Sequence, residues 1–184
     1  MSSPMSERML GDPSPREKLA RMIRVDQAGE FGAVRIYQGQ RAVLGRDPAC
    51  RDALRHMEQQ EREHLARFNR LMTENRVRPT ALTPLWHLAG FALGAGTALL
   101  GAKAAMACTV AVEDVIEGHY ARQEAELGDD QSELKATVAQ FRRDEVAHRD
   151  AALEQGAEKA DFYPLLHGAI SAGTRLAIWL SERI

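Results

Sequence analysis

The sequence carries one four-residue motif twice, since Glu61-Arg-Glu-His64 and Glu145-Val-Ala-His148 both read Glu-x-x-His. Residues three apart on a helix lie on one face, so each motif presents a carboxylate and an imidazole together. In both segments the motif continues an apolar stripe, which is the face that a helix turns toward a bundle core. One copy is common in a Glu-rich chain. Two copies on inward faces indicate a metal site, because a metal ion neutralises carboxylates that are costly to bury.

Two further glutamates stand at matching distances before the motifs. Glu30 precedes Glu61 by 31 residues, and Glu113 precedes Glu145 by 32 residues. In each half, both glutamates are expected about 20 Å from the turn between two helices, at the helical rise per residue. All four carboxylates are therefore expected at one level of a bundle, as in helical carboxylate sites for two iron ions.

The expected ligands are oxygen and nitrogen donors only. This set suits iron or manganese, and it has no thiolate that would select zinc or copper(I). Its four carboxylates balance the charge of two divalent cations. We expect two iron ions that bind O2 or peroxide between them. The expected ligands are Glu30, Glu61 and His64 for one iron ion and Glu113, Glu145 and His148 for the other, with Glu61 and Glu145 bridging the two.

Other acidic residues are weaker candidates for ligands. Glu117 shares a helix face with Glu113 but is one turn closer to the end of its helix, and Glu58 has no histidine three residues later. Asp144 and Asp26 are candidate hydrogen-bond partners for the ligand histidines. Both also fit as acids on a helix surface, so the two readings stay open.

Helices must position these residues. The chain is rich in Ala, Leu, Glu and Arg and has no long period-two alternation, so no sheet is expected. Asp47-Pro48 predicts the start of the second helix, and Asp129 or Asp130 predicts the cap of the fourth bundle helix. The expected fold is a single all-α domain over 16–184, a ferritin-like four-helix bundle with extra apolar, membrane-associated helices. Its expected parts are a first hairpin over 16–76, an apolar segment over 79–102, a second hairpin over 103–157 and a C-terminal apolar helix over 162–184.

Composition narrows the class of protein. The 184 residues carry 24 Lys and Arg against 26 Asp and Glu, a net charge of -2 that does not suit a nucleic-acid binder. Cys50 and Cys108 are too few for a disulfide framework or a Cys-rich zinc site, and they are expected as reduced thiols. Residues 1–15 are polar and contain three prolines. They lack the apolar core of a signal peptide and are expected to form a disordered lead.

The segment 79–102 has 24 residues without a formal charge, long enough by length alone to span a bilayer. A single crossing would leave the ligands of the two hairpins on opposite sides of the membrane, and the site could not assemble. The segment is therefore expected to return to its starting side, as an apolar helix in the membrane interface or against a partner. The C-terminal helix extends this surface. The alternative is that both segments complete the bundle core.

Three long stretches resemble the demethoxyubiquinone hydroxylases, which are carboxylate-bridged di-iron monooxygenases of ubiquinone biosynthesis. The stretches are IRVDQAGEFGAVRIYQGQ, RVRPTALTPLWHLAGFALGAGTALLGAKAAMACTVAVED and RLAIWLSERI. The resemblance covers nearly everything after residue 16, and its first- and third-helix ligands fall on Glu30 and Glu113. It implies two iron ions and hydroxylation of the demethoxyubiquinone ring with O2 and NADH. No Gly-rich dinucleotide fingerprint occurs, so a nicotinamide must bind without a Rossmann unit.

The resemblance also implies a setting for the reaction. The substrate is a lipid precursor of ubiquinone, a lipid-binding protein of the same pathway is a partner, and a homo-oligomer is open. The expected location is peripheral, on the cytoplasmic side of a bacterial inner membrane or the matrix side of the mitochondrial inner membrane. Tyr120, seven residues after Glu113, matches a family tyrosine implicated in electron or proton delivery. The alternative for Tyr120 is an ordinary core tyrosine.

Two other functions share this ligand set. One is a soluble ferroxidase or peroxide scavenger, and the other is a non-enzymatic iron-storage protein. The segment 79–102 favours the hydroxylase, because a soluble storage shell has little use for 24 uncharged residues in the middle of the chain.

Overall fold

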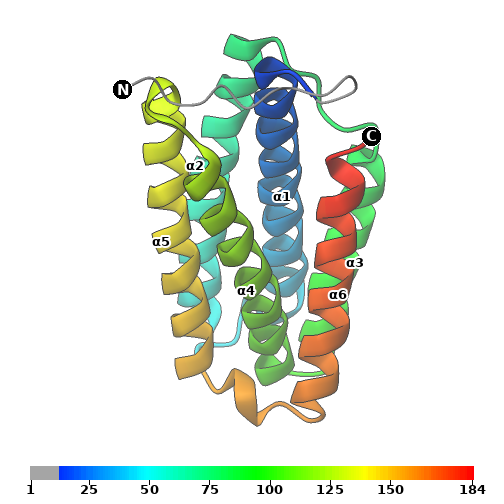
Figure 1. The fold of residues 1–184 in the computed structure, drawn as a ribbon. Helices are drawn as coiled ribbons and strands as arrows, with labels where there is room; N and C mark the ends of the chain where they lie inside the picture. The colour runs from blue at the N-terminus through cyan, green and yellow to red at the C-terminus, as the bar shows by residue number, and fades with distance from the viewer. Residues whose placement is uncertain (1–12) are drawn as a thin grey trace.

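The structure is a computed structural model that describes residues 13–184. The predicted disordered lead over 1–15 lies mostly outside the described residues, but its end is ordered, since Ser14 caps α1 and Pro15 is its first residue. Within 13–184 the chain is helical and has no strand, so the all-α prediction is confirmed (Figure 1). The helices are α1 (Pro15–Leu44), α2 (Arg51–Asn75), α3 (Thr83–Leu99), α4 (Ala102–Glu126), α5 (Ser132–Glu154) and α6 (Tyr163–Ser181), with short 3-10 turns at Asp129–Gln131 and Ala157–Lys159.

The helices form two similar three-helix units. In the first, α1 and α2 form a hairpin and α3 packs on α1; in the second, α4 and α5 form a hairpin and α6 packs on α4. In Figure 1, α2 and α5 lie on the left, α3 and α6 on the right, and α1 and α4 between them. The two hairpins make the four-helix bundle, and α3 and α6 are the additional helices.

Two helix starts differ from the prediction. The Asp47 carboxylate accepts a hydrogen bond from the Ala49 backbone N–H at 2.9 Å, so Asp47 closes a turn and α2 begins only at Arg51. Similarly, Asp129 and Asp130 lie in a 3-10 turn before α5. At Asp47 the carboxylate stabilises the connecting turn, a role that sequence alone does not distinguish from that of a helix cap.

Glycines allow α3 to lie against α1 with almost no gap. A Cβ built on Gly94 would stand 2.8 Å from the carbonyl carbon of Ile36 and closer still to its oxygen. A Cβ on Gly39 would meet the backbone of α3 in the same way, 2.6 Å from the Ala95 nitrogen. Any side chain at these positions would force the two backbones apart.

No helix within 13–184 has the length and apolarity needed to cross a membrane.

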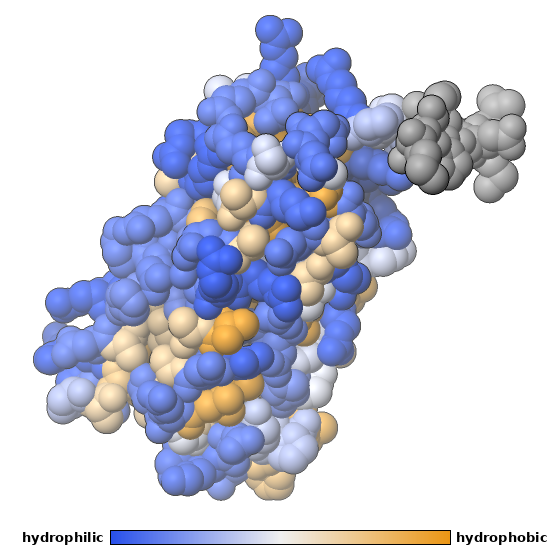
Figure 2. All heavy atoms as spheres, turned by 60° about the vertical axis from the view of Figure 1, so that its left-hand side comes forward, coloured by the Kyte–Doolittle hydropathy of each residue, from blue (hydrophilic) through white to orange (hydrophobic). Residues whose placement is uncertain are grey.

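The additional helices carry nearly all of the exposed large hydrophobic side chains. Only Gly90, Gly94, Thr97 and Ala98 of α3 are buried, so most of the helix surface does not pack into the bundle core. By contrast, the face in Figure 2, reached by bringing the α5 side of Figure 1 forward, is mainly hydrophilic. Among the described residues, the exposed large hydrophobics are Leu85, Leu88, Phe91, Leu99 and Leu100 on or next to α3, Phe162, Leu165, Leu176, Trp179 and Ile184 on or next to α6, and Val43.

Candidate metal centre

The six predicted ligands meet in the middle of the four-helix bundle. One glutamate comes from each of α1 and α4, and one Glu-x-x-His pair comes from each of α2 and α5. All six side chains are buried, with at most 3% of any residue exposed. The buried set is Glu30, Glu61, His64, Glu113, Glu145 and His148.

The six side chains form two overlapping groups. Within each group, one ligand atom from every member lies within 4.8 Å of the others. Glu61 and Glu145 belong to both groups, which is the arrangement expected of bridging carboxylates. The first group is Glu30, Glu61, His64 and Glu145, and the second is Glu61, Glu113, Glu145 and His148.

The donor atoms of these side chains fit a metal site because they are buried and lack hydrogen-bond partners. His148 Nδ1 lies 3.0 Å from Glu61 Oε1, and His64 Nδ1 lies 3.4 Å from Glu30 Oε2, yet none of these atoms has a hydrogen-bond partner. Buried polar atoms without partners cost free energy, and metal ligation removes that cost. The unpartnered atoms at this place are Oε2 of Glu30 and Glu113, both carboxylate oxygens of Glu61 and Glu145, and Nδ1 of His64 and His148.

The protonation of the cluster also indicates a cation site. Burial, together with the neighbouring carboxylates, raises the pKa of Glu61 and of Glu113 well above their usual range. Burial opposes the charged form of His64, but the adjacent carboxylates of Glu145 and Glu30 overcome this and raise its pKa to about 12. Without a cation, protons must offset the buried negative charge. Two divalent cations would replace those protons.

Each ligand histidine is oriented by a partner on its outer nitrogen. His64 Nε2 lies 3.2 Å from Asp144 Oδ2, and His148 Nε2 lies 3.1 Å from Gln60 Oε1. Asp144 therefore contacts a candidate ligand, as the sequence suggested. Gln60 was missed, although it precedes Glu61 just as Asp144 precedes Glu145. Such contacts fix the tautomer and the ring orientation of metal-binding histidines.

Neither reading that the sequence left open for Asp26 holds, because the residue is buried and its histidine partner is not a candidate ligand. Its Oδ1 lies 2.9 Å from His119 Nε2 and accepts a hydrogen bond of 2.7 Å from Gln123. Asp26 is one helical turn nearer the start of α1 than Glu30, and there it faces α4 rather than α2 or α5. Burial raises the pKa of Asp26 above its usual value, against the opposing effect of His119.

A tyrosine donates a hydrogen bond to each of the two outer glutamates. The Tyr120 hydroxyl donates to Glu30 Oε1, and the Tyr37 hydroxyl donates to Glu113 Oε1 at 2.7 Å. The sequence singled out Tyr120 and missed Tyr37. The available signal was spacing, because Tyr37 follows Glu30 by the same seven residues as Tyr120 follows Glu113.

The weaker candidates have other partners and lie outside both groups. Glu117 accepts a hydrogen bond of 2.7 Å from Arg142. Glu58 is buried but forms ion pairs with Arg41 and Arg62. These carboxylates are neutralised by arginine, so they do not compete for the metal site.

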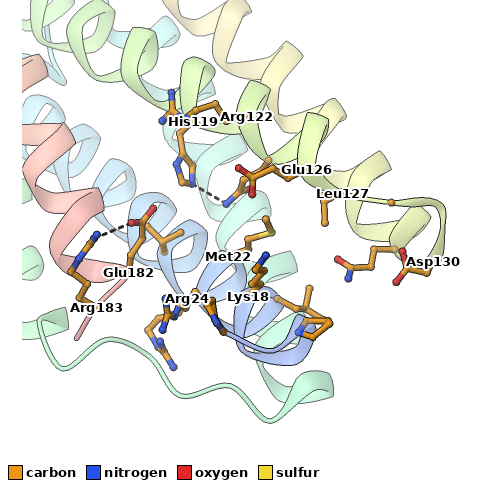
Figure 3. A pocket seen from close by; sticks show the side chains of 18 residues that line it. Lys18, Met22, Arg24, His119, Arg122, Glu126, Leu127, Asp130, Glu182 and Arg183 are labelled. Atoms are coloured by element: carbon orange, nitrogen blue, oxygen red, sulfur yellow. Dashed lines mark hydrogen bonds and ion pairs between the residues drawn. The ribbon is translucent and has the colours of Figure 1, made fainter. Parts of the chain in front are cut away.

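Two cavities approach the centre from different surroundings. An apolar cavity of about 480 Å³ lies among α1, α3, α4 and α6 and reaches Glu30 and Tyr120. A polar cleft of about 1170 Å³ opens at one end of the bundle, where Figure 3 shows basic side chains from α1, from α4 and from the C-terminal end of the chain. His119 lines both. The charged lining of the cleft is Lys18, Arg21, Arg24, Arg122 and Arg183, against Glu126, Asp130 and Glu182.

A family model described as "Ubiquinone biosynthesis protein COQ7" matches residues 17–181. The chain belongs to this family. The residues matched by this model include all six candidate ligands, Tyr37 and Tyr120, and the whole of α3 and α6.

Several relatives resemble the chain over most of its length. The 3-demethoxyubiquinol 3-hydroxylase of Rhodospirillum rubrum is 61% identical over 97% of this chain and 84% of its own. The NADPH-dependent 3-demethoxyubiquinone 3-hydroxylase, mitochondrial, of Bos taurus is 50% identical over the same shares. The 5-demethoxyubiquinone hydroxylase, mitochondrial, of Saccharomyces cerevisiae is 44% identical over 90% of this chain and 78% of its own. The family resemblance seen in the sequence is therefore confirmed, and the chain joins the COQ7 proteins.

Proposed function

We propose that this protein hydroxylates the ring of demethoxyubiquinone at a centre of two iron ions, using O2 and electrons from NADH or NADPH. The relatives support the substrate, since their names describe hydroxylation of demethoxyubiquinone or demethoxyubiquinol. The donor set of four carboxylates and two imidazoles supports iron.

The apolar cavity carries the proposal. It ends at Glu30 and Tyr120, so a ring inside it would lie against one side of the metal centre. Most of its lining is aliphatic or glycine, which suits a hydrophobic quinone and excludes water. A protein that only stores iron needs no apolar cavity directed at its ligands.

Two iron ions bound here would supply the activation of O2 for insertion of one oxygen atom into the ring. The chain's own residues have other tasks. Glu61 and Glu145, which belong to both groups, would each contribute carboxylate oxygens to both ions. Burial and the neighbouring Glu30 raise the pKa of Tyr120 well above its usual value, so its hydroxyl stays protonated and continues to donate to Glu30.

The polar cleft is the proposed site for the reductant. NADH and NADPH share an anionic pyrophosphate, and the cleft has five cationic side chains against three carboxylates. His119 lies between the cleft and the apolar cavity, directly before Tyr120. Electrons from a nicotinamide in the cleft would pass His119 and Tyr120, which contacts the candidate ligand Glu30.

We also propose that α3 and α6 rest on a membrane surface, where the lipid substrate resides, or on a lipid-binding partner. The exposed leucines and aromatic side chains of these helices, such as Leu88, Leu99 and Trp179, support this contact. The mitochondrial location in the names of the eukaryotic relatives fits a peripheral position on the inner membrane, on the matrix side. A bacterial protein would occupy the cytoplasmic side of the inner membrane.

Labelled O2 tests the hydroxylase. Purified iron-loaded protein is given NADH, a demethoxyubiquinone and ¹⁸O2, and the quinone is analysed by mass spectrometry. One labelled oxygen atom on the ring is expected. Label in water alone, together with mineralised iron, would instead support the ferroxidase or storage alternative.

Flotation with liposomes tests the membrane contact. Leu88→Glu with Leu99→Glu places two charges on exposed positions of α3 and should release the protein from vesicles while its iron content stays unchanged. The matched control adds the same charge on the opposite side, with Gln59→Glu on α2 and Ala136→Glu on α5, both exposed. Equal flotation of the two double variants would contradict the proposal.

A further inference from the structure

The two outer glutamates are held in the same way from opposite helices. Glu30 lies on α1 and accepts from Tyr120 of α4, while Glu113 lies on α4 and accepts from Tyr37 of α1. In each carboxylate the tyrosine occupies Oε1, and Oε2 is left buried without a partner. The hydroxyl of each tyrosine thus selects which oxygen remains for a metal.

We propose that Tyr37 is a positioning residue for the metal centre, which holds Glu113 as a ligand through the single oxygen Oε2. This inference rests on the proposed two-metal site. A glutamate restrained to one oxygen leaves a coordination position free on its metal, where a second oxygen of the same carboxylate would otherwise bind. Tyr120 has the matching effect on Glu30, so each half of the centre has its own positioning tyrosine.

Tyr37 is suited to this task because it is buried against the centre, 1% exposed, with its ring edge-on to His148 at 6.2 Å between centroids. Within 13–184 the partners of its hydroxyl are Glu113 and, at 3.7 Å, the Met57 sulfur. Its ring is enclosed by an apolar cluster that includes Leu54 and Met106.

The two tyrosines differ in access. Tyr120 lines the apolar cavity, whereas Tyr37 does not line that cavity or the polar cleft. The hydroxyl of Tyr37 therefore acts on the centre through Glu113, while the edge-on contact of its ring with His148 is kept in Tyr37→Phe.

Binding of Co2+ to single-site variants tests the proposal without any turnover. His64→Ala removes the imidazole of one group and leaves the Glu113 and His148 group, while His148→Ala leaves the Glu30 and His64 group. Tyr37→Phe is then added to each. When Tyr37→Phe is added to the His64→Ala protein, we expect the affinity for Co2+ to fall about 10-fold or more, the range seen when a hydrogen-bond partner of a ligand is lost. A change in the visible Co2+ spectrum should accompany it, because the coordination of Glu113 changes.

In the His148→Ala protein, Tyr37→Phe should leave both the Co2+ affinity and the spectrum unchanged. Tyr120→Phe should do the reverse, lowering the affinity and changing the spectrum in the His148→Ala protein and changing neither in the His64→Ala protein. Met57→Leu is the packing control, since it removes the other contact of the Tyr37 hydroxyl and keeps an apolar side chain of similar volume. Equal effects of Tyr37→Phe in both backgrounds, or no effect in either, would overturn the assignment. Loss of Co2+ binding in the unmodified protein would instead count against the metal centre itself, so the two failures are distinguishable.

Discussion

Replacing Gly94 by alanine should separate α3 from α1. The new Cβ would stand 2.8 Å from the carbonyl carbon of Ile36, against about 3.5 Å or more for relaxed non-bonded carbons. Because the atoms in the way are backbone, no rotamer change relieves the overlap, and α3 must move by about 1 Å. Overpacking of this kind costs about 1–3 kcal/mol. Alanine recovers about 0.5–1 kcal/mol through its better helix propensity.

The two ranges leave a net loss for Gly94→Ala of up to about 2.5 kcal/mol, and of about 1 kcal/mol at their midpoints. For a chain of this length a loss of about 1 kcal/mol lowers Tm by roughly 2–4 °C. Thermal unfolding of the metal-free protein, followed by circular dichroism, measures the shift.

Gly96→Ala is the matched control on the same helix. A Cβ at Gly96 meets nothing within 4 Å, so only the propensity gain applies and Tm should rise slightly. If Gly94→Ala proved as stable as Gly96→Ala, the close packing of α1 and α3 described above would be wrong.

Three further predictions concern the centre and its surroundings. Glu113→Ala should lose bound iron while Glu117→Ala keeps two iron ions per chain, and metal analysis that found the reverse would refute the ligand assignment. Asp144→Ala should weaken the metal held by His64 by about 10-fold, because the imidazole loses its partner at 3.2 Å; competition with a chelator measures this, and an unchanged affinity would argue against it. Burial would raise the pKa of Glu58, but its two arginine partners lower it below the usual 4.5, so its ion pairs stabilise the fold above about that pH and cease to do so as the carboxylate is protonated in acid. Urea unfolding should therefore show Glu58→Gln less stable by about 1 kcal/mol at pH 7, with the difference shrinking toward pH 3, and a difference that did not depend on pH would contradict this reasoning.

The set of candidate ligands could be predicted from the sequence because the helical rise converts a spacing in sequence into a position along the bundle. Once two Glu-x-x-His motifs and two hairpins are recognised, the rise per residue places Glu30 and Glu113 at the level of the motifs. The prediction that Glu61 and Glu145 bridge the two ions rests instead on their place in the Glu-x-x-His motifs, and the structure puts both residues in both groups. No knowledge of side-chain contacts was needed for these residues.

The remaining features depend on which helix faces which, and spacing alone does not settle that. Asp26 and Glu30 are one turn apart on α1 and both contact α4, yet Asp26 pairs with His119 and only Glu30 also lies next to His64 of α2. Tyr37 and Gln60 repeat the pattern of Tyr120 and Asp144, so comparison of the two halves of the chain would have found both. The start of α2 at Arg51 could not be predicted by this comparison, because an aspartate carboxylate accepts backbone N–H groups both in a turn and at a helix cap.

The sharing of Glu61 and Glu145 by both groups has a consequence for how the two halves of the chain hold together. Each metal would take ligands from both hairpins, so neither hairpin alone offers a complete set. Metal binding then acts as a non-covalent crosslink, because its free energy is gained only when the hairpins are joined. Fragments produced by cutting the chain between α2 and α3 should associate far more tightly with metal than without it, and the bound ions should leave only when the fragments part.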